Sequence, residues 1–363
     1  MITLDRLQAT LGKFQGLTIG LVGDLFLDRY LDIDPDLQEL SIETGLEAYQ
    51  VTRIRNNPGA LGTIINNLAA LGVGRLVPVT VIGEDGQAFD LLQALEALPV
   101  DPGHILQDKR RKTPTYTKPM RREPDGQWRE LNRIDLRNRE ALASDTEREL
   151  LARVSTALEA TDGLIVLDQV NEEGWGVVTP AVRERLAELC AARPDKLVFI
   201  DSRAHIHRFR AGVLKPNRAE CVRAAASWSA EKGVAQTAAS VDLGADLKAV
   251  QRAAETLAAS TGRPLFCTLA EQGILVVEPG RPTVRVPALV PEGPIDPVGA
   301  GDSVTAGMVA SLLSGASPTE AAAVGNLVSS ITIRQLGSTG TASPAEVLAA
   351  WPRLETAEHH PLR

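Results

Sequence analysis

The sequence predicts an α/β fold, a doubly wound and mainly parallel sheet with helices on both faces and a small β lid. Short apolar runs that end in glycine or aspartate recur along the 363 residues, as expected for buried parallel strands. Segments with helical spacing of apolar residues separate these runs, and such alternation is typical of a parallel sheet. Two polar stretches interrupt the alternation, and they predict the lid.

Three consecutive segments predict the start of the sheet. Residues 17–23 form a β-rich apolar run that ends at a glycine, which suits a buried strand. Residues 63–71 repeat apolar side chains on one helical face and are followed by a glycine that ends the helix. Residues 76–82 are the next apolar strand.

The same alternation continues in the second half of the chain. Apolar strands are expected at 163–168 and 196–201, with a helix over 180–192 between them. The two strands end in Asp168 and Asp201. Because ligands bind outside the carboxyl ends of strands in open α/β sheets, both aspartates are expected to point into one crevice.

The last elements complete the predicted sheet. Residues 265–268 read as a strand, and residues 273–277 read as a hairpin-like strand beside it. Two helices are expected near the C-terminus, one after Asp302 and one after Pro318.

The lid is predicted from two stretches, roughly 30–57 and 113–135. Both are polar, alternate irregularly and contain turn residues, so they do not fit a buried sheet. A lid over the crevice would exclude water during group transfer. We therefore expect a single domain over residues 1–355, followed by a polar tail at 356–363.

Composition limits the classes of function. The formal net charge of −8 gives no basic field for nucleic acid, although a local basic patch could still bind a small anion. The cysteines lack the paired spacing of a zinc site or a disulfide scaffold, and we read them as reduced core residues. No segment reads as a signal peptide or an apolar membrane span. We expect a cytoplasmic protein without membrane or nucleic-acid partners.

The strongest chemical motif is the small-residue turn at 296–303, which opens a helix. Gly299, Ala300 and Gly301 let the backbone approach an anion closely, and free N–H groups at a helix start favour negative charge. Asp302 stands where it can take a proton from a hydroxyl. The alternative is a glycine-rich turn in which Asp302 is an ordinary N-cap.

This motif, late in a chain with an alternating sheet and a lid, resembles the ribokinase-like (PfkB) carbohydrate kinase family. The resemblance covers nearly the whole chain and implies a ribokinase-like fold. It implies that residues 299–301 form an anion hole and that Asp302 is the catalytic base. It also implies a site at Asp296 and Val298 for a monovalent cation such as K⁺. The family usually has threonine where this chain has Pro297.

The resemblance extends to a nucleotide site for ATP. Asn217 and Glu220 match the family's Asn-x-x-Glu motif, which organises Mg²⁺ through its water and the phosphates; on its own this spacing also fits a helix N-terminus. Thr268, Gly273 and Asn326 match positions on the adenosine side. The Gly-x-x-x-x-Gly-Lys-Ser/Thr motif of P-loop proteins is absent from the sequence.

The acceptor site is implied by two further motifs. Asp28 occupies the position of the family's sugar-binding aspartate. Asp24 fits a turn residue satisfied by backbone groups slightly better than the alternative, a direct sugar contact. Residues around Gly59 resemble the family's second signature, a glycine pair followed by a sugar-binding asparagine, but Ala60 replaces its second glycine and Thr63 replaces its asparagine. These departures leave the acceptor open.

Within the family, the likeness is to the kinase module that acts on D-glycero-β-D-manno-heptose 7-phosphate. Five segments resemble that module in order and spacing: residues 23–30, 115–118, 132–135, 271–273 and 336–339. A phosphorylated sugar needs cationic recognition away from the transfer centre, and Lys118 and Arg133 are candidates. Departures at Met120 and after Asp168 allow a shifted substrate.

The sequence thus predicts an ATP- and Mg²⁺-dependent kinase acting on a sugar or sugar phosphate. Two alternatives stay open. One is a non-catalytic regulatory member that binds sugar or nucleotide; the other is a kinase for ribose, fructose phosphate or a nucleoside. A lid sheet with one exposed apolar face needs covering, so a homodimer through the lid is expected.

Overall fold

The chain is built around a nine-stranded sheet. A computed structural model describes residues 2–231, 246–289, 293–337 and 339–359. In spatial order the strands are β16 (Val284–Val286), β15 (Ile274–Val277), β14 (Leu265–Thr268), β13 (Val213–Leu214), β12 (Leu197–Ser202), β11 (Gly163–Asp168), β1 (Thr18–Gly23), β6 (Arg75–Ile82) and β7 (Ile105–Gln107). Strands β14 to β7 run parallel, and β15 and β16 are antiparallel to their neighbours. The predicted mainly parallel sheet is confirmed.

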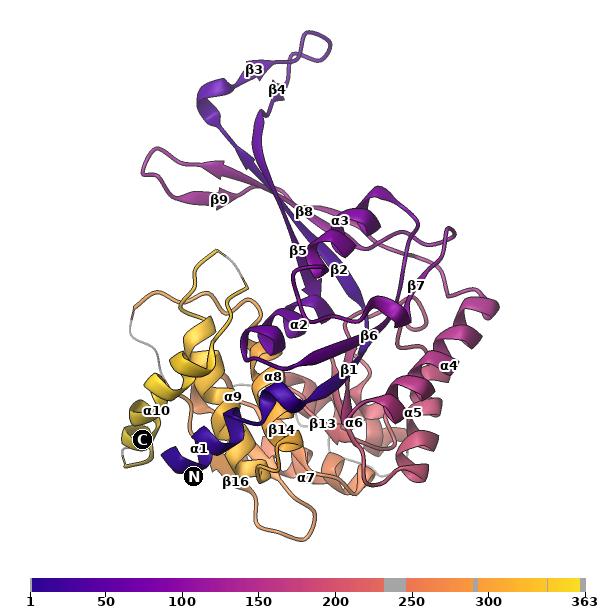
Figure 1. Ribbon diagram of the computed structural model, residues 1–363, viewed down its shortest axis with the longest axis vertical. Coiled ribbons are helices and arrows are strands. Elements are labelled where there is room, and N and C mark those ends of the chain that lie inside the picture. The colour runs from indigo at the N-terminus through magenta and orange to yellow at the C-terminus, as the bar shows by residue number, and fades with distance from the viewer. Residues whose placement is uncertain (1, 232–245, 290–292, 338, 360–363) are drawn as a thin grey trace.

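Helices cover both faces of this sheet (Figure 1). One face packs against α1 (Leu4–Leu11), α2 (Leu61–Ala70), α3 (Gly86–Leu95), α8 (Ala300–Leu313), α9 (Pro318–Thr332) and α10 (Pro344–His359). The other face packs against α4 (Ser144–Ala160), α5 (Pro180–Ala192), α6 (Arg218–Glu231) and α7 (Leu247–Thr261).

The central strands are apolar on both faces, which explains this doubly wound arrangement. In β11, Ile165 and Leu167 enter the core under α2 and α8, whereas Leu164 and Val166 enter the core under α4 and α5. All four are fully buried. Because successive side chains of a strand point to opposite faces, a continuous apolar run requires cover on both sides.

The lid is a second sheet that stands above the first (Figure 1). Its strands follow the order β10 (Ile134–Leu136), β8 (Thr115–Arg122), β2 (Leu25–Ile33) and β5 (Val51–Ala60), with β9 (Trp128–Glu130) paired to β8. It uses both predicted stretches and extends them, since β2 starts before residue 30 and β5 continues past residue 57. A short hairpin of β3 (Glu39–Leu40) and β4 (Glu47–Ala48) forms an arm at its far end.

Two predicted boundaries differ in the structure. The helix expected after Asp302 is α8, and it begins two residues earlier, at Ala300. The predicted tail at 356–363 is partly helical, because α10 continues to His359. Residues 360–363 lie outside the described part of the chain.

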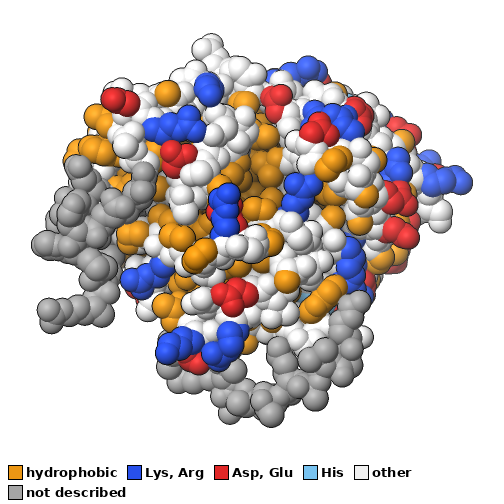
Figure 2. Space-filling model, turned by 90° about the horizontal axis from the view of Figure 1, so that it is seen from below, with side chains coloured by type: hydrophobic (Ala, Val, Ile, Leu, Met, Phe, Trp, Pro, Cys, Tyr) orange, Lys and Arg blue, Asp and Glu red, His pale blue; other side chains and the backbone are white. Residues whose placement is uncertain are grey.

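The helices and one face of the surface bear on two expectations, the absence of a membrane span and the absence of a basic field that could bind nucleic acid. Among helices formed by the described residues, none has both the length and the apolar character needed to cross a membrane. Figure 2 shows the end of the molecule opposite the lid arm, where acidic and basic side chains are interspersed with apolar ones. The described part of that face carries no continuous basic field.

Candidate active site

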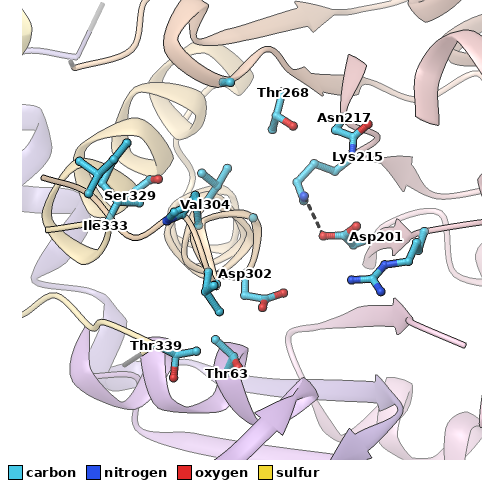
Figure 3. A pocket seen from close by; sticks show the side chains of 18 of the residues that line it. Thr63, Asp201, Lys215, Asn217, Thr268, Asp302, Val304, Ser329, Ile333 and Thr339 are labelled. Atoms are coloured by element: carbon cyan, nitrogen blue, oxygen red, sulfur yellow. Dashed lines mark ion pairs between the residues drawn. The ribbon is translucent and has the colours of Figure 1, made fainter. Parts of the chain in front are cut away.

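A pocket of about 1030 Å³ lies between the lid sheet and the carboxyl ends of the parallel strands. The predicted site residues that line it are Asp28, Thr63, Lys118, Arg133, Asn217, Glu220, Thr268, Gly273, Val298, Gly299, Ala300, Gly301, Asp302 and Asn326. Two predicted residues, Gly59 and Asp296, lie outside this lining. The fold therefore brings together residues that are far apart in the sequence (Figure 3).

The start of α8 is a left-handed turn at Gly299, which has a φ of 79°. A Cβ at this position would approach side-chain carbons of Thr63 and Thr339 at 3.2 and 3.3 Å. Glycine is favoured here for both reasons, because other residues rarely adopt this φ and a Cβ would be crowded. The turn packs the start of α8 against Thr63 of α2.

The backbone amides of this turn are not equivalent. The Ala300 N–H donates to the carbonyl of Pro297 at 3.1 Å, so the expectation that residues 299–301 all keep free amides is wrong for Ala300. Among the described residues, the amides of Gly301 and Asp302 have no acceptor. They stand at the positive end of the helix and can receive an anion.

Asp302 lies in the first turn of α8, and its side chain points into the pocket toward Asp201 (Figure 3). The N-cap is Gly299, so the interpretation of Asp302 as an ordinary N-cap does not apply. Burial and then the charge of Asp201 raise the pKa of Asp302 to about 7, against the opposing effects of Lys215 and Arg203. A carboxyl group with this pKa is well matched to general base catalysis near neutral pH.

Lys215 was not assigned a role from the sequence. It follows β13, is only 4% exposed, and places its Nζ 2.7 Å from Oδ2 of Asp201. A Cβ on Gly301 would lie 3.7 Å from this Nζ, so the ammonium group stands beside the free amide. Burial opposes the charge of Lys215, but the neighbouring carboxylates, Asp201 foremost, together outweigh burial and raise the pKa of Lys215. The sequence signal was a lysine directly after a short apolar strand.

The Asp296 carboxylate connects the turn before α8 to the segment around Gly337 by hydrogen bonds. Its carboxylate accepts the Val298 N–H at 3.0 Å and the Gly337 N–H at 3.1 Å. Two amide hydrogens already point at this carboxylate, and it is not part of the pocket lining. A cation at Asp296 and Val298 stays a prediction.

Asn217 and Glu220 form a reciprocal cap at the start of α6. The Asn217 N–H donates to the Glu220 carboxylate at 2.8 Å, and the Glu220 N–H donates to Oδ1 of Asn217 at 2.9 Å. This is the helix N-terminus that the spacing also allowed. Both residues line the pocket as well, and burial raises the pKa of Glu220.

The donor set fits magnesium only as a water-mediated partner. Asn217 and Glu220 supply carboxamide and carboxylate oxygens, which are hard ligands of the kind that Mg²⁺ uses. Within the described residues there is no cluster of three or more metal-binding side chains of His, Cys, Asp or Glu. The pair therefore suits an ion that arrives with the nucleotide phosphates and keeps most of its waters.

Two of the three residues on the predicted adenosine side contact the chain at residues 286–287. Gly273 has a φ of 91°, and a Cβ there would lie 2.0 Å from the carbonyl oxygen of Val286. The Asn326 side chain donates to the carbonyl of Pro287 at 2.8 Å. Thr268 ends β14 and donates its N–H to Pro216, next to Asn217. All three line the pocket, and their nucleotide contacts stay predictions.

The lid supplies a buried ion pair to the opposite end of the pocket. Asp28 on β2 and Lys118 on β8 are both 8% exposed, and their charged atoms lie 3.5 Å apart. Burial raises the pKa of Asp28. Lys118 also donates to the Tyr30 hydroxyl at 3.1 Å. A Cβ on Gly59 would lie 2.7 Å from Oδ2 of Asp28, so Gly59 makes room for this carboxylate.

Arginines gather at the end of the pocket that holds Asp28. Arg133 and Arg137 lie over the Tyr116 ring, at 4.2 and 5.3 Å, and both pair with Asp135. Arg203, at the end of β12, lines the same end of the pocket and makes no ion pair with any residue that the structure describes. Arg137 and Arg203 were missed from the sequence because only the fold brings the two segments together.

The two aspartates expected in one crevice have different places. Asp201 lines the pocket, but Asp168 lies outside its lining, where it accepts the Ser202 hydroxyl at 2.8 Å. The common crevice is therefore wrong for Asp168. Asp24 is satisfied by backbone amides, as its turn position indicated.

Comparison with known sequences gives a consistent answer. The family model described as pfkB family carbohydrate kinase matches residues 30–346. The bifunctional protein HldE of Trichlorobacter lovleyi is 30% identical over 332 residues, which are 91% of this chain and 62% of that protein. HldE of Geobacter sulfurreducens is 27% identical over 96% of this chain and 65% of that protein. The chain thus spans less than two thirds of the length of these relatives.

Solved structures show the same fold. Ribokinase from Arabidopsis thaliana, solved with ribose and ATP, superposes with a TM-score of 0.62 at 15% identity and covers 92% of this chain and 98% of its own. Phosphofructokinase-2 from Escherichia coli, solved with potassium, gives a TM-score of 0.64 at 19% identity over 93% of this chain and 99% of its own. Together with the family match over most of the length, the ribokinase-like fold identifies this chain as a member of the pfkB family of carbohydrate kinases.

Proposed function

We propose that this protein transfers the γ-phosphoryl group of ATP to a hydroxyl group of a sugar phosphate in the cytoplasm. The observation that carries the proposal is the start of α8. There Asp302, with a pKa raised to about 7, stands beside two free backbone amides and the buried ammonium group of Lys215. A base and an anion site side by side are what phosphoryl transfer requires.

The transfer is an in-line displacement at the γ-phosphorus. The acceptor hydroxyl oxygen forms the new O–P bond while the bond to the β–γ bridging oxygen breaks and ADP leaves. Asp302 takes the hydroxyl proton. The amides of Gly301 and Asp302 and the Lys215 ammonium stabilise the negative charge on the equatorial oxygens.

Asn217 and Glu220 are the residues that would hold magnesium through its waters. The ion would neutralise the β- and γ-phosphates when bound. Thr268, Gly273 and Asn326 would line the adenosine part of ATP. Potassium at Asp296 and the Val298 backbone is a further expectation of the family resemblance.

The acceptor end favours an anionic substrate. Arg133, Arg137 and Arg203 carry three positive charges, and Asp135 offsets one of them, whereas the Asp28–Lys118 pair is neutral. This cluster of positive charge contrasts with the net charge of −8 for the chain. A phosphate monoester, with about −1.5 to −2 charges at neutral pH, would balance it. Asp28 would then place the sugar hydroxyls.

The experiment is a coupled assay of ADP release over paired acceptors. The panel holds D-glycero-D-manno-heptose 7-phosphate, fructose 6-phosphate, ribose 5-phosphate and the three unphosphorylated sugars. We expect turnover on at least one phosphorylated acceptor. ATP binding without turnover on any acceptor would instead support a non-catalytic regulatory member, and turnover on an unphosphorylated sugar alone would support a different acceptor class.

We also propose that the protein forms a homodimer through the lid. Large apolar side chains are exposed on the lid and its arm: Leu37, Leu40, Ile42, Leu46, Tyr49, Val51, Ile54, Trp128 and Ile134. Monomers rarely leave such a set uncovered. Sedimentation equilibrium should give a dimer that Ile42→Asp weakens, and a monomer at high concentration would contradict this.

A further inference from the structure

The lid sheet is joined to the body where the chain crosses between the two sheets. The chain enters β2 at Asp24, leaves β5 at Leu61, enters β8 after Arg111 and leaves β10 before Glu140. A loop between β11 and α5, residues 169–178, lies at these crossings. We call this loop the strap.

Asp24 ties two crossings to both ends of the strap. It is 4% exposed, and its carboxylate accepts the Val177 N–H at 2.7 Å and the Gln169 N–H at 3.3 Å. Its own carbonyl oxygen accepts the Leu61 N–H at 3.0 Å. The two crossings, from β1 into β2 and from β5 into α2, therefore meet at the buried Asp24.

The strap closes on this carboxylate because it has a glycine at the point of contact. A Cβ on Gly176 would lie 2.9 Å from Oδ1 of Asp24 and 2.9 Å from Cβ of Val170. Neither contact leaves room for a side chain, so only glycine allows the approach.

Arg111 links the strap to the other two crossings, which lead into β8 and out of β10. Its guanidinium group is buried and donates to the carbonyl of Trp175, in the strap, at 2.6 Å. It also donates to the carbonyl of Glu140 at 2.7 Å. Because Pro114, three residues later, accepts the Leu27 N–H at 2.8 Å, the anchored segment runs directly into the lid sheet.

The strap itself is fixed to the body. Arg183 on α5 is 6% exposed, and it donates to the Val178 carbonyl at 3.1 Å and to Glu173 at 2.7 Å. At its other end, Gln169 continues from β11 and lines the pocket. The strap is therefore held in place on the body by Arg183, and its Gln169 end lies at the pocket.

We propose that Asp24 and Arg111 are positioning residues that hold the lid sheet over the pocket through the strap. The proposal rests on the proposed function, because it takes the lid as the part that binds the acceptor. Neither residue lines the pocket, so each acts through the placement of Asp28 and Lys118. A shift of about 1 Å in such groups can cost about 10²-fold in rate.

The first test compares kinetics in Asp24→Ala, Arg111→Met and the control Arg110→Met. Arg110 is the neighbouring residue and also makes several contacts, to Asp108 and Asp145, but none to the strap. For the two strap variants we expect the KM of heptose 7-phosphate or fructose 6-phosphate to rise by about tenfold or more, as for loss of a charged buried hydrogen bond. The KM for ATP should stay within about twofold, because the nucleotide residues lie on the body.

The second test needs no turnover. Hydrogen exchange of β2 and β8 amides should accelerate by about tenfold or more in both strap variants, with β1 and β11 unchanged. Asp24→Asn keeps an acceptor for Val177 and should fall between Asp24→Ala and the parent protein. If Asp24→Ala does not fold, Gly176→Ala perturbs the same contact by inserting a Cβ.

The outcomes separate the two proposals. The positioning role would be overturned if both strap variants kept the wild-type exchange rates of the β2 and β8 amides and the wild-type KM for the acceptor. It would also be overturned if Arg110→Met changed these quantities as much as the strap variants do. Absence of turnover on every acceptor would overturn the kinase proposal alone, since the exchange comparison still decides the role of the strap.

Discussion

The two ends of the pocket are built in different ways. The phosphoryl end is made mainly of consecutive residues at the start of α8, with backbone amides and a glycine at a φ of 79°, and Lys215 lies beside them. The acceptor end is made of side chains on β2 and β8, of the two arginines that flank β10, and of Arg203 from the body. Backbone chemistry in one short turn fixes a reaction type, whereas scattered side chains can change with the substrate.

Loss of the base should have the largest effect and tests the phosphoryl end directly. For Asp302→Asn we expect kcat to fall by about 10²–10⁴-fold, because a positioned base is removed. Calorimetry should show that ATP still binds. Near-normal turnover in a folded variant would remove Asp302 from the mechanism.

Lys215→Met should be the next most severe change. Removing one preorganised group that stabilises transition-state charge costs about 10²–10³-fold in kcat. Steady-state kinetics of Lys215→Met and Lys215→Arg check this, and the arginine variant should retain more activity because it keeps the charge. Equal activity in all three proteins would mean that the Asp201–Lys215 pair is purely structural.

Gly59→Ala tests the acceptor end of the pocket through the position of Asp28. The added Cβ would lie 2.7 Å from Oδ2 of Asp28, so the carboxylate must move. We expect the KM for the acceptor to rise by about 10- to 100-fold, since a misplacement near 1 Å can cost about 10²-fold. The KM for ATP should stay the same, and a parallel rise in both constants would show that the two ends are not independent.

Arg137→Gln should act on phosphorylated acceptors alone. We expect about a tenfold rise in their KM, the usual effect of losing one charge-assisted hydrogen bond. Arg122→Gln is the matched control, a lid arginine on β8 that does not line the pocket. An identical effect on unphosphorylated sugars would contradict the anion subsite.

The pH dependence should give the smallest change. Because the pKa of Asp302 is raised to about 7, kcat/KM should increase with pH and level off above about 7. Asp201→Asn should move the midpoint to lower pH, since the Asp201 charge raises this pKa. A profile unchanged by Asp201→Asn would assign the midpoint to another group.

The raised pKa of Asp302 also makes the free energy of unfolding depend on pH. Between the ordinary aspartate range and about pH 7 the folded protein binds a proton at Asp302 that the unfolded chain has released. The free energy of unfolding should therefore decrease as pH rises through this window. Denaturant titrations at several pH values should show that Asp302→Asn loses this part of the dependence.

Much of the fold was predictable because it depends on local patterns. Apolar runs such as residues 163–168 need cover on both faces, and this requirement alone implies a sheet between two layers of helices. The turn at Gly299 was predictable for a similar reason, since its glycine and the helix that follows are adjacent in sequence. The bond from the Ala300 amide to Pro297 was not, because it depends on how the turn closes.

The amino-acid sequence by itself determined the doubly wound sheet, the lid and the turn that carries Asp302, because periodicity and neighbouring residues encode them. Only the tertiary structure decided which charges meet. It placed Lys215 against Asp201, brought Arg203 to the lid arginines, and left Asp168 outside the pocket. Electrostatic contacts depend on distance in space between strands whose order in the sheet differs from their order in the chain.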